Sequence, residues 1–328
     1  MTSTSVSAVA PHARPAAEWA RPPADRQAPE VDVLIPSAGR SADLAVTLAG
    51  LAGQDRPSFR VTISDQSPGG SGTAAPAVQA MLRVLDAQGR APRVLMHPER
   101  RGLAEQRQFL LDHADAPAVL FLDDDVWLEP GTVDRMLDAL RTYDCGLIGS
   151  AVQGLSYLDD ERPDELRAFE PWDGPVKPER VRRGTPEHDR WPLHNAANPT
   201  HLAARHVRPD GSWRAYRIAW VGGCVLYDRE DLLAVGGFDF WRDLPPEHAG
   251  EDVVAQWRVM ERFGGAGVLP SGAVHTEAPT TVVDRRIDAP DVLMTDRDDA
   301  AADSQKPEPP RQAADQCAVQ GGADQERK

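Results

Sequence analysis

The stretch VLFLDDDVWLEPG (residues 119–131) decides how the rest of the sequence is interpreted. It begins with a short apolar run of the kind that is buried in parallel sheets. Three adjacent acids follow directly, Asp123, Asp124 and Asp125, and Pro130 is well placed for the first turn of a helix. A buried strand that ends in carboxylates and leads into a helix is typical of an α/β protein, whose ligands lie at the carboxyl ends of its strands.

The alternation of strand and helix extends in both directions from this stretch. Upstream, apolar runs predict strands at 31–36, 59–64 and 93–97, each followed by a helix. Downstream, we expect a strand at 146–152, two strands joined by a Gly-Gly turn within 216–228, a helix ended by Gly264, and a last strand at 266–270. This order predicts a Rossmann-like α/β fold, with a mainly parallel central sheet and helices on both faces.

Composition divides the chain into five segments. Residues 1–29 are rich in Ala, Pro, Ser and Arg, and residues 289–328 in Asp, Gln, Pro and Ala, so we expect a disordered leader and a disordered acidic tail. The α/β pattern occupies residues 30–153 and 215–288. Between them, residues 154–214 break the alternation, and an insertion of this length without secondary structure is usually functional or mobile.

The charge and cysteine content exclude several classes of function. The 328 residues include 36 basic and 51 acidic ones, a net charge of −15, which argues against nucleic-acid binding and against docking on an anionic lipid surface. Three cysteines without a CxxC spacing argue against a disulfide framework and a cysteine zinc site. Because no apolar run approaches the ~18 residues of a membrane span, and no secretory signal is evident, we expect a cytoplasmic protein without a transmembrane segment.

The three acids after the fourth strand predict a metal site. Three adjacent carboxylates repel one another, and a hard divalent cation would remove the conflict. On an extended segment Asp123 and Asp125 would point the same way. The alternative is a solvated acidic loop before a helix N-terminus.

Further candidates lie where other strands and helices begin or end. Asp65 ends the second strand and is suited either to a nucleotide base or ribose or to an ordinary Asx turn. Glu251 and Asp252 open a helix, where acids stabilise the N-terminus but could also supply a general base. His275 follows the last strand and could be a metal ligand or simply a hydrogen-bonded residue.

Two arginines and a glycine complete the set of candidates. Arg101 and Arg107 flank the start of the third helix, and a helix N-terminus with nearby guanidinium groups is a good site for a diphosphate. Gly223 lies between two predicted strands and would let the backbone approach a ligand closely. A loop exposed to solvent and a plain turn are the alternatives.

Taken in order, these motifs resemble those of family 2 glycosyltransferases of the GT-A fold. The resemblance covers residues 31–277, and its motifs are VLIPSAGR (33–40), ISDQS (63–67), RRGLAEQRQ (100–108), VLFLDDDVWLEPG (119–131), GGCVLYDREDLLAVGGFD (222–239) and GEDVVAQWRV (250–259). It implies transfer of a sugar from a nucleotide diphosphate sugar to an acceptor hydroxyl. It leaves the acceptor open: a glycan, a lipid-linked sugar, a natural product or a protein.

The resemblance also assigns roles to the candidate residues. Asp123 and Asp125 would be the D-x-D pair that binds Mn²⁺ or Mg²⁺, with His275 completing the metal shell. Asp252 would be the catalytic base of an inverting transfer, and Glu251 would orient the acceptor. Asp65 would contact the nucleotide base, and the remaining donor contacts would come from Arg101, Arg107, Asp124 and Gly223.

By the same resemblance, residues 30–153 would bind the nucleotide sugar, residues 215–288 would carry the acceptor and catalytic half, and the insertion would be related to the acceptor. A lipid-linked acceptor would require peripheral docking at the inner face of the membrane. The segment PSAGR (36–40) departs from the Thr-Tyr-Asn usual after the first strand. Two alternatives stay open: a nucleotidyltransferase that makes an activated sugar, and a non-catalytic nucleotide- or carbohydrate-binding module.

Overall fold

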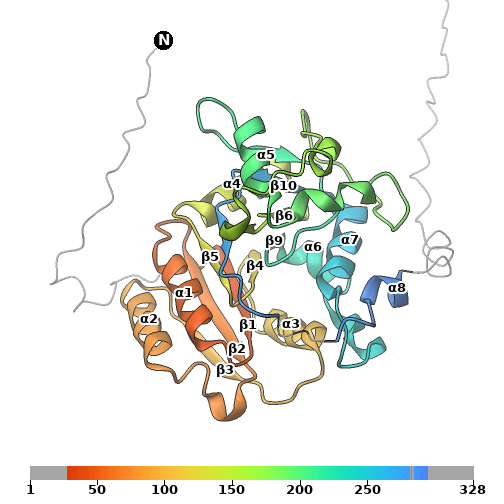
Figure 1. The fold of residues 1–328 in the computed structure, drawn as a ribbon. Coiled ribbons are helices and arrows are strands. Elements are labelled where there is room, and N and C mark those ends of the chain that lie inside the picture. The colour runs from red at the N-terminus through yellow and green to blue at the C-terminus, as the bar shows by residue number, and fades with distance from the viewer. Residues whose placement is uncertain (1–27, 281, 283, 295–328) are drawn as a thin grey trace, which may run out of the picture. The chain divides into compact units, whose positions relative to one another are not determined.

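An eight-stranded sheet forms the middle layer of the protein (Figure 1). The computed structural model describes residues 28–280, 282 and 284–294. Across the sheet the strands follow the order β3 (Arg93–Met96), β2 (Phe59–Asp65), β1 (Val31–Ser37), β4 (Ala118–Leu122), β9 (Cys224–Asp228), β6 (Leu147–Gly149), β10 (Gly265–Leu269) and β8 (Arg214–Tyr216). β9 runs antiparallel to both β4 and β6, and β8 runs antiparallel to β10. The remaining neighbours pair in parallel, so the sheet is mainly parallel, as predicted.

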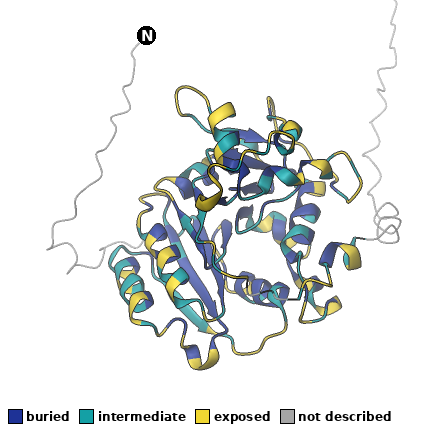
Figure 2. Cartoon of the chain, in the orientation of Figure 1, coloured by how far each residue is buried: buried dark blue, intermediate teal, exposed yellow. Residues whose placement is uncertain are grey.

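Helices cover both faces of this sheet, and the alternation along β1 shows why. Val33 and Ile35 point to one face and Leu34 to the other. The first face packs against α1 (Ser41–Ala52), α2 (Pro76–Ala87) and α4 (Thr132–Tyr143). The second packs against α3 (Leu103–Asp112), α6 (Arg229–Ala234) and α7 (Glu251–Phe263). Figure 2 shows the strands as the most buried layer and the outer faces of the helices as exposed.

A second, three-stranded sheet lies beside the end of β4. It consists of β5 (Val126–Leu128), β11 (Ala273–His275) and β7 (Gln153–Gly154), with β11 in the middle. β11 pairs antiparallel with β5, which places His275 opposite Val126. The sequence pattern did not predict β5 or β11, because each has only three residues. Their pairing brings His275 next to the acids that precede Val126.

Two local predictions differ from the structure. Residues 216–228 do not form a hairpin, because β8 pairs with β10 at the sheet edge while β9 lies between β4 and β6. The Gly-Gly segment instead carries the chain from the edge of the sheet to its centre, where Gly223 has a φ of +76°. Pro130 lies before α4 rather than in its first turn, because Gly131 is the N-cap.

The insertion is short of regular structure but is not structureless. It contains η3 (Leu155–Tyr157), η4 (Glu165–Ala168), η5 (His188–His194) and α5 (Asn198–His206), and its last residue, Arg214, begins β8. An ion pair in its interior fixes η5, because Arg190 contacts both carboxylate oxygens of Glu179. Arg217 contacts the same carboxylate at 2.8 Å. The insertion is therefore packed and anchored to the segment that follows it.

The first residues of the predicted tail are ordered. Residues 289–293 form α8 (Ala289–Leu293), and Ala289 is fully buried. The rest of the predicted tail, from residue 295, and residues 1–27 of the predicted leader lie outside the described residues. Two further short helices, η2 (Pro68–Gly70) and η6 (Asp239–Asp243), complete the described elements. No helix in the described ranges is long and apolar enough to cross a membrane.

Candidate functional site

The three adjacent acids lie in a turn between β4 and β5. The amide of Val126 donates a hydrogen bond to the carbonyl oxygen of Asp123 at 3.3 Å, so the alternation expected for an extended segment does not describe this turn. The turn is fixed from two sides. The amide of Asp123 donates to the carbonyl oxygen of Gly223 at 2.9 Å. The amide of Thr276 donates to the carbonyl oxygen of Asp125 at 2.8 Å.

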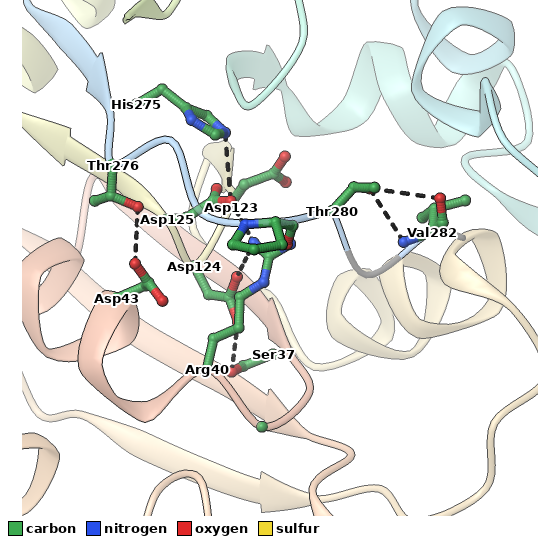
Figure 3. A network of polar contacts seen from close by, with 12 residues as sticks. Ser37, Arg40, Asp43, Asp123, Asp124, Asp125, His275, Thr276, Thr280 and Val282 are labelled. Atoms are coloured by element: carbon green, nitrogen blue, oxygen red, sulfur yellow. Dashed lines mark hydrogen bonds and ion pairs between the residues drawn. The ribbon is translucent and has the colours of Figure 1, made fainter. Parts of the chain in front are cut away.

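Asp124 and Asp125 share one guanidinium group, that of Arg40 (Figure 3). Nη1 of Arg40 contacts Oδ2 of Asp125 and lies 3.3 Å from Oδ1 of Asp124. The hydroxyl of Ser37 donates to Oδ2 of Asp124 at 2.7 Å. Burial nevertheless raises the pKa of Asp124 to about 7. Burial would also raise the pKa of Asp125, but the contacts with His275 and Arg40 outweigh it and lower this pKa.

His275 faces Asp125 from β11. Its Nε2 lies 3.3 Å from Oδ2 of Asp125, and this hydrogen bond raises the pKa of the imidazole. Its Nδ1 accepts a hydrogen bond from the amide of Glu277 at 2.7 Å. In the neutral ring the proton is therefore on Nε2, where it is directed at Asp125.

A divalent cation fits this pair of residues. Two ligands at a right angle on one cation, with bonds of about 2.1 Å, lie about 3 Å apart, and Asp125 Oδ2 and His275 Nε2 are 3.3 Å apart. Among the described residues no group of three or more His, Cys, Asp or Glu is placed to hold a metal. Phosphate oxygens and water commonly complete the shell of such an ion. For Nε2 to become a ligand, the ring proton would have to move to Nδ1, which would break the hydrogen bond from the Glu277 amide. The Arg40 contact with Asp125 would also have to break.

Arg107 connects the two acidic groups of the site. Its Nε donates to Oε1 of Glu251 and its Nη2 to Oδ1 of Asp123, each at 3.0 Å. Burial would lower the pKa of this guanidinium, but the surrounding carboxylates raise it. A permanently charged Arg107 thus binds the turn after β4 to the N-terminus of α7.

Asp252 is the second residue of α7, and its carboxylate forms no ion pair within the described structure. Its Oδ1 accepts a hydrogen bond only from the amide of Val253, at 3.0 Å. Desolvation and the neighbouring charge of Glu251 raise the pKa of Asp252 to about 7, and Arg107 opposes the shift. A carboxyl group of this kind is half-charged near neutral pH, which suits a general base.

These groups line one cavity of about 610 Å³. Arg40, the three aspartates and His275 line it, and so do Trp220, Trp257, His188 and Arg183. Asp252 and Gly222 also line it, and a Cβ on Gly222 would lie 4.0 Å from Oδ2 of Asp252.

A second cavity, of about 320 Å³, shares Leu103 and Val282 with the first and is lined by Ala38, Gln66, Arg100, Gln106 and His248 among others. Volumes of this size are typical of small-molecule sites.

Asp65 lies outside both cavities and is fully buried. Its Oδ1 accepts from the amide of Ser67 at 2.7 Å, and its Oδ2 accepts from the amide and hydroxyl of Thr73 at 3.0 and 2.6 Å. Burial would raise the pKa of Asp65, but these hydrogen bonds lower it. The side chain therefore organises the loop after β2, and a contact with a nucleotide base stays a prediction.

Arg101 and Gly223 differ in how close they come to the cavities. The side chain of Arg101 is 54% exposed and pairs with Glu99, and it lines neither cavity; its neighbour Arg100 lines the smaller one. Gly223 lines the larger one, and its positive φ disfavours any other residue. Sequence reasoning did not assign a role to Arg40, although its place just after the first strand, in the unusual segment PSAGR, was the available signal.

Comparison with known proteins identifies the family. The sequence profile described as glycosyl transferase family 2 matches residues 32–203, just over half of the chain. The chain belongs to glycosyl transferase family 2. No curated protein matches the sequence significantly. The matched residues include Arg40, Arg107 and the three aspartates, whereas Asp252 and His275 follow them.

A solved glycosyltransferase structure shares the fold of this family 2 member. The mannosyltransferase PcManGT from Pyrobaculum calidifontis, solved with GDP-Man and Mn²⁺, is 18% identical with a TM-score of 0.50, over 81% of this chain and 64% of that one. TarS 1–349 from S. aureus, solved with UDP-GlcNAc, is 14% identical with a TM-score of 0.45, over 76% of this chain and 59% of that one. This chain thus spans less than two thirds of either. The GT-A fold and membership of glycosyl transferase family 2, both predicted from the sequence, are confirmed.

In this family 2 member, the insertion contributes to the cavity through residues that lie outside the sequence motifs. Arg183 and His188 line the cavity. Trp172 instead lies under the guanidinium of Arg217, 3.8 Å from its ring centre. Trp191 is 43% exposed and lies parallel to Trp220, with 6.4 Å between the ring centroids. The indole of Trp220 therefore forms a wall of the cavity with a second indole beside it.

Proposed function

We propose that the protein transfers a sugar from a nucleotide diphosphate sugar to an acceptor hydroxyl, with inversion and with Asp252 as the general base. The observation that carries the proposal is the position of Asp252: its carboxyl group, with a pKa raised to about 7, lines the same cavity as the acids after β4. The family and the fold support the reaction class.

The donor would occupy the part of the cavity that lies at the carboxyl ends of β1 and β4, where ligands of α/β sheets bind. Its diphosphate would lie near Arg40 and the aspartates, and its nucleoside in the adjoining smaller cavity beside Arg100 and Gln66. We propose that this end belongs to the nucleotide-sugar half of the chain, residues 30–153. Asp123 and Asp124 would take part in donor binding through Arg107, Arg40 and Ser37, which hold them.

A divalent cation, Mn²⁺ or Mg²⁺, would be held by Asp125 and His275 together with the donor's phosphate oxygens. Asp123, the third ligand predicted from the sequence, is instead held by Arg107, and no three such residues in the described part of the chain are placed on one ion. When bound, the cation would neutralise charge on the leaving diphosphate. The residues of the chain do the rest. Arg107 fixes Glu251 and Asp123 relative to each other, and Asp252 takes the proton of the acceptor hydroxyl as that hydroxyl attacks the anomeric carbon. Direct displacement of this kind inverts the configuration.

The acceptor would enter from the side of the insertion. Trp220, Trp257 and His188 line the cavity together with Arg183, and burial lowers the pKa of His188, so aromatic side chains lie beside one permanent positive charge. Aromatic faces of this kind suit the C–H face of a sugar ring. We therefore propose that residues 154–214 help to bind a sugar acceptor, and residues 215–288 position its hydroxyl at Asp252.

Replacement of the base tests the proposal. We expect Asp252→Asn to abolish release of nucleoside diphosphate from the donor, while the affinity for the nucleoside diphosphate stays within a factor of about two, because the amide keeps the shape but cannot accept a proton. Asp243→Asn, an exposed aspartate on η6, is the matched control and should keep full turnover. Near-normal turnover of Asp252→Asn would refute this assignment of the base.

The products separate this function from its alternatives. A glycosyltransferase releases a nucleoside diphosphate, whereas a nucleotidyltransferase would form the nucleotide sugar from a nucleoside triphosphate and a sugar phosphate. A binding module would bind nucleotide without turnover of any donor. The anomeric configuration of the glycoside, measured by NMR, decides between inversion and retention.

A further inference from the structure

We propose that Arg40 is the resident counter-ion of Asp125, that a divalent cation must displace it, and that the displaced guanidinium then binds the diphosphate of the donor. This inference rests on the proposed function for its last step only. The competition between Arg40 and a cation for Asp125 is a property of the protein alone and is tested without a donor.

The contacts of Arg40 place it where an ion would be needed. Its Nη1 contacts Oδ2 of Asp125, which is also the oxygen that faces Nε2 of His275. The same nitrogen lies 3.3 Å from Asp124, so one guanidinium compensates both carboxylates. Its side chain is 15% exposed and lines the main cavity. Figure 3 shows Arg40 reaching the aspartate turn from the loop before α1.

An ion and Arg40 exclude each other at this carboxylate. A divalent cation bound between Asp125 and His275 would need Oδ2 as a direct ligand at about 2.1 Å. That oxygen is already in hydrogen-bond contact with the guanidinium. The two cations would also repel each other strongly at such a distance in a poorly hydrated site. Binding of the ion therefore requires that Nη1 leaves Oδ2.

The charges around the cavity indicate where the guanidinium goes. The residues that line it carry six acidic and four basic side chains, a formal balance of 4 − 6 = −2. A diphosphate adds further negative charge beside Arg40, and a guanidinium binds such a group through two parallel hydrogen bonds. Arg40 keeps its place in the cavity wall throughout, because it directly precedes α1 and its carbonyl oxygen accepts from the amide of Leu44 at 2.9 Å. The displaced group thus needs only a side-chain rotation to reach a donor phosphate.

Displacement also releases a second contact. Nη2 of Arg40 donates to the carbonyl oxygen of Pro279 at 2.7 Å, in the segment that follows His275. Residues 278, 280 and 282 of this segment line the main cavity. Arrival of the ion at Asp125 therefore removes the contact of Pro279 with Arg40, while the Thr276 amide stays bound to the carbonyl oxygen of Asp125. The ion and the donor thus act on one side chain, and each favours the binding of the other.

Binding of Mn²⁺ to the protein without nucleotide tests the competition, with free Mn²⁺ measured by electron paramagnetic resonance. We expect Arg40→Gln to bind Mn²⁺ about tenfold more tightly than the wild type, because loss of one charge-assisted hydrogen bond is worth roughly that factor. Arg40→Lys keeps the charge and should lie between the two. Arg56→Gln is the control. Arg56 is 80% exposed and pairs with Asp134 rather than with the aspartates of the site, so this variant should bind Mn²⁺ with the affinity of the wild type.

Titrations with GDP and with UDP, at saturating Mn²⁺, test whether the displaced guanidinium of Arg40 binds the diphosphate. Here Arg40→Gln should bind the nucleotide at least about fivefold more weakly than the wild type, because the guanidinium is missing from the diphosphate. A gain in Mn²⁺ affinity together with a loss in nucleotide affinity cannot come from general damage to the fold. Equal or weaker binding of Mn²⁺ alone by Arg40→Gln and Arg40→Lys would overturn the proposal. Failure of both nucleotides to bind the wild type would count against the proposed function but not against the competition.

Discussion

Arg107 donates a hydrogen bond from its Nε to Oε1 of Glu251 at 3.0 Å, and the two side chains are only 5% and 4% exposed. The pair joins α3 to α7 across the site, and Nη2 of the same arginine holds Asp123. A buried ion pair of this kind is costly to break from one side, because the partner charge is left without compensation.

We therefore expect Arg107→Gln to lower the free energy of unfolding by about 3–5 kcal/mol, measured by urea denaturation. Arg101→Gln provides the control, because that arginine is 54% exposed and its pair with Glu99 lies in solvent. Its effect should stay within about 0.5 kcal/mol. Equal effects of the two substitutions would show that Arg107 does not bear the structural role assigned to it.

Asp252 should make the protein less stable at alkaline pH. Its pKa is raised to about 7 in the folded state, so the folded state holds its proton more tightly than the unfolded state, and this contribution to stability is lost as the pH rises through 7. Asp252→Asn should therefore be more stable than the wild type at pH 8, by about 1–3 kcal/mol. The gain should shrink at pH 5. A gain independent of pH would argue against the raised pKa.

The rate of transfer should fall on the acid side of neutrality. A general base must be deprotonated, so kcat/KM should decrease about tenfold per pH unit below an apparent pKa near 7. The initial rate of nucleoside diphosphate release gives this profile. Asp124 also has a pKa of about 7, so the profile of Asp124→Asn is the control. The acid limb should persist in that variant, and its disappearance would assign the limb to Asp124.

Asp65 should act through the loop that it holds. Asp65→Asn replaces one acceptor by a donor that faces the amide groups of Ser67 or Thr73, and we expect a loss of about 1–3 kcal/mol in the free energy of unfolding at pH 7. Because the pKa of Asp65 is lowered in the folded state, the loss should diminish as the pH falls below about 4. The exposed Asp55→Asn is the control. An Asp65→Asn protein of unchanged stability would leave nucleotide contact as the better role for this residue.

Long apolar runs and local signals made much of the fold predictable. The strands near 31–36, 59–64 and 93–97 and the helix before Gly264 lie within about two residues of their predicted bounds. The failures involve pairing between remote segments. The apolar runs around the Gly-Gly pair are typical of a hairpin, but their partners are β10, β4 and β6, which no local pattern reveals.

Part of the candidate site was also predictable, again where the signal lies in a local stretch of sequence. A strand end pointed to Asp123, Asp124 and Asp125 and a helix start to Asp252, and all four line one cavity. The position of His275 depends on two three-residue strands that are too short to show a pattern. The contact between Arg40 and Asp125 spans 85 positions in the sequence. Trp220 follows the insertion in the chain and lines the same cavity as His188 of the insertion, which no local sequence pattern indicates.

Thermal unfolding with nucleotide ligands tests the central claim, that the cavity is a donor site of a glycosyltransferase, most directly. The protein would be melted with a panel of nucleoside diphosphates and nucleotide sugars, first with Mn²⁺ and then with EDTA. A ligand at about 100 times its dissociation constant adds about 2.7 kcal/mol to the stability of the folded state, a shift of several degrees. We predict such a shift for one nucleoside, with Mn²⁺ and not with EDTA. A well-folded protein that shifts with no nucleotide under either condition would contradict the claim.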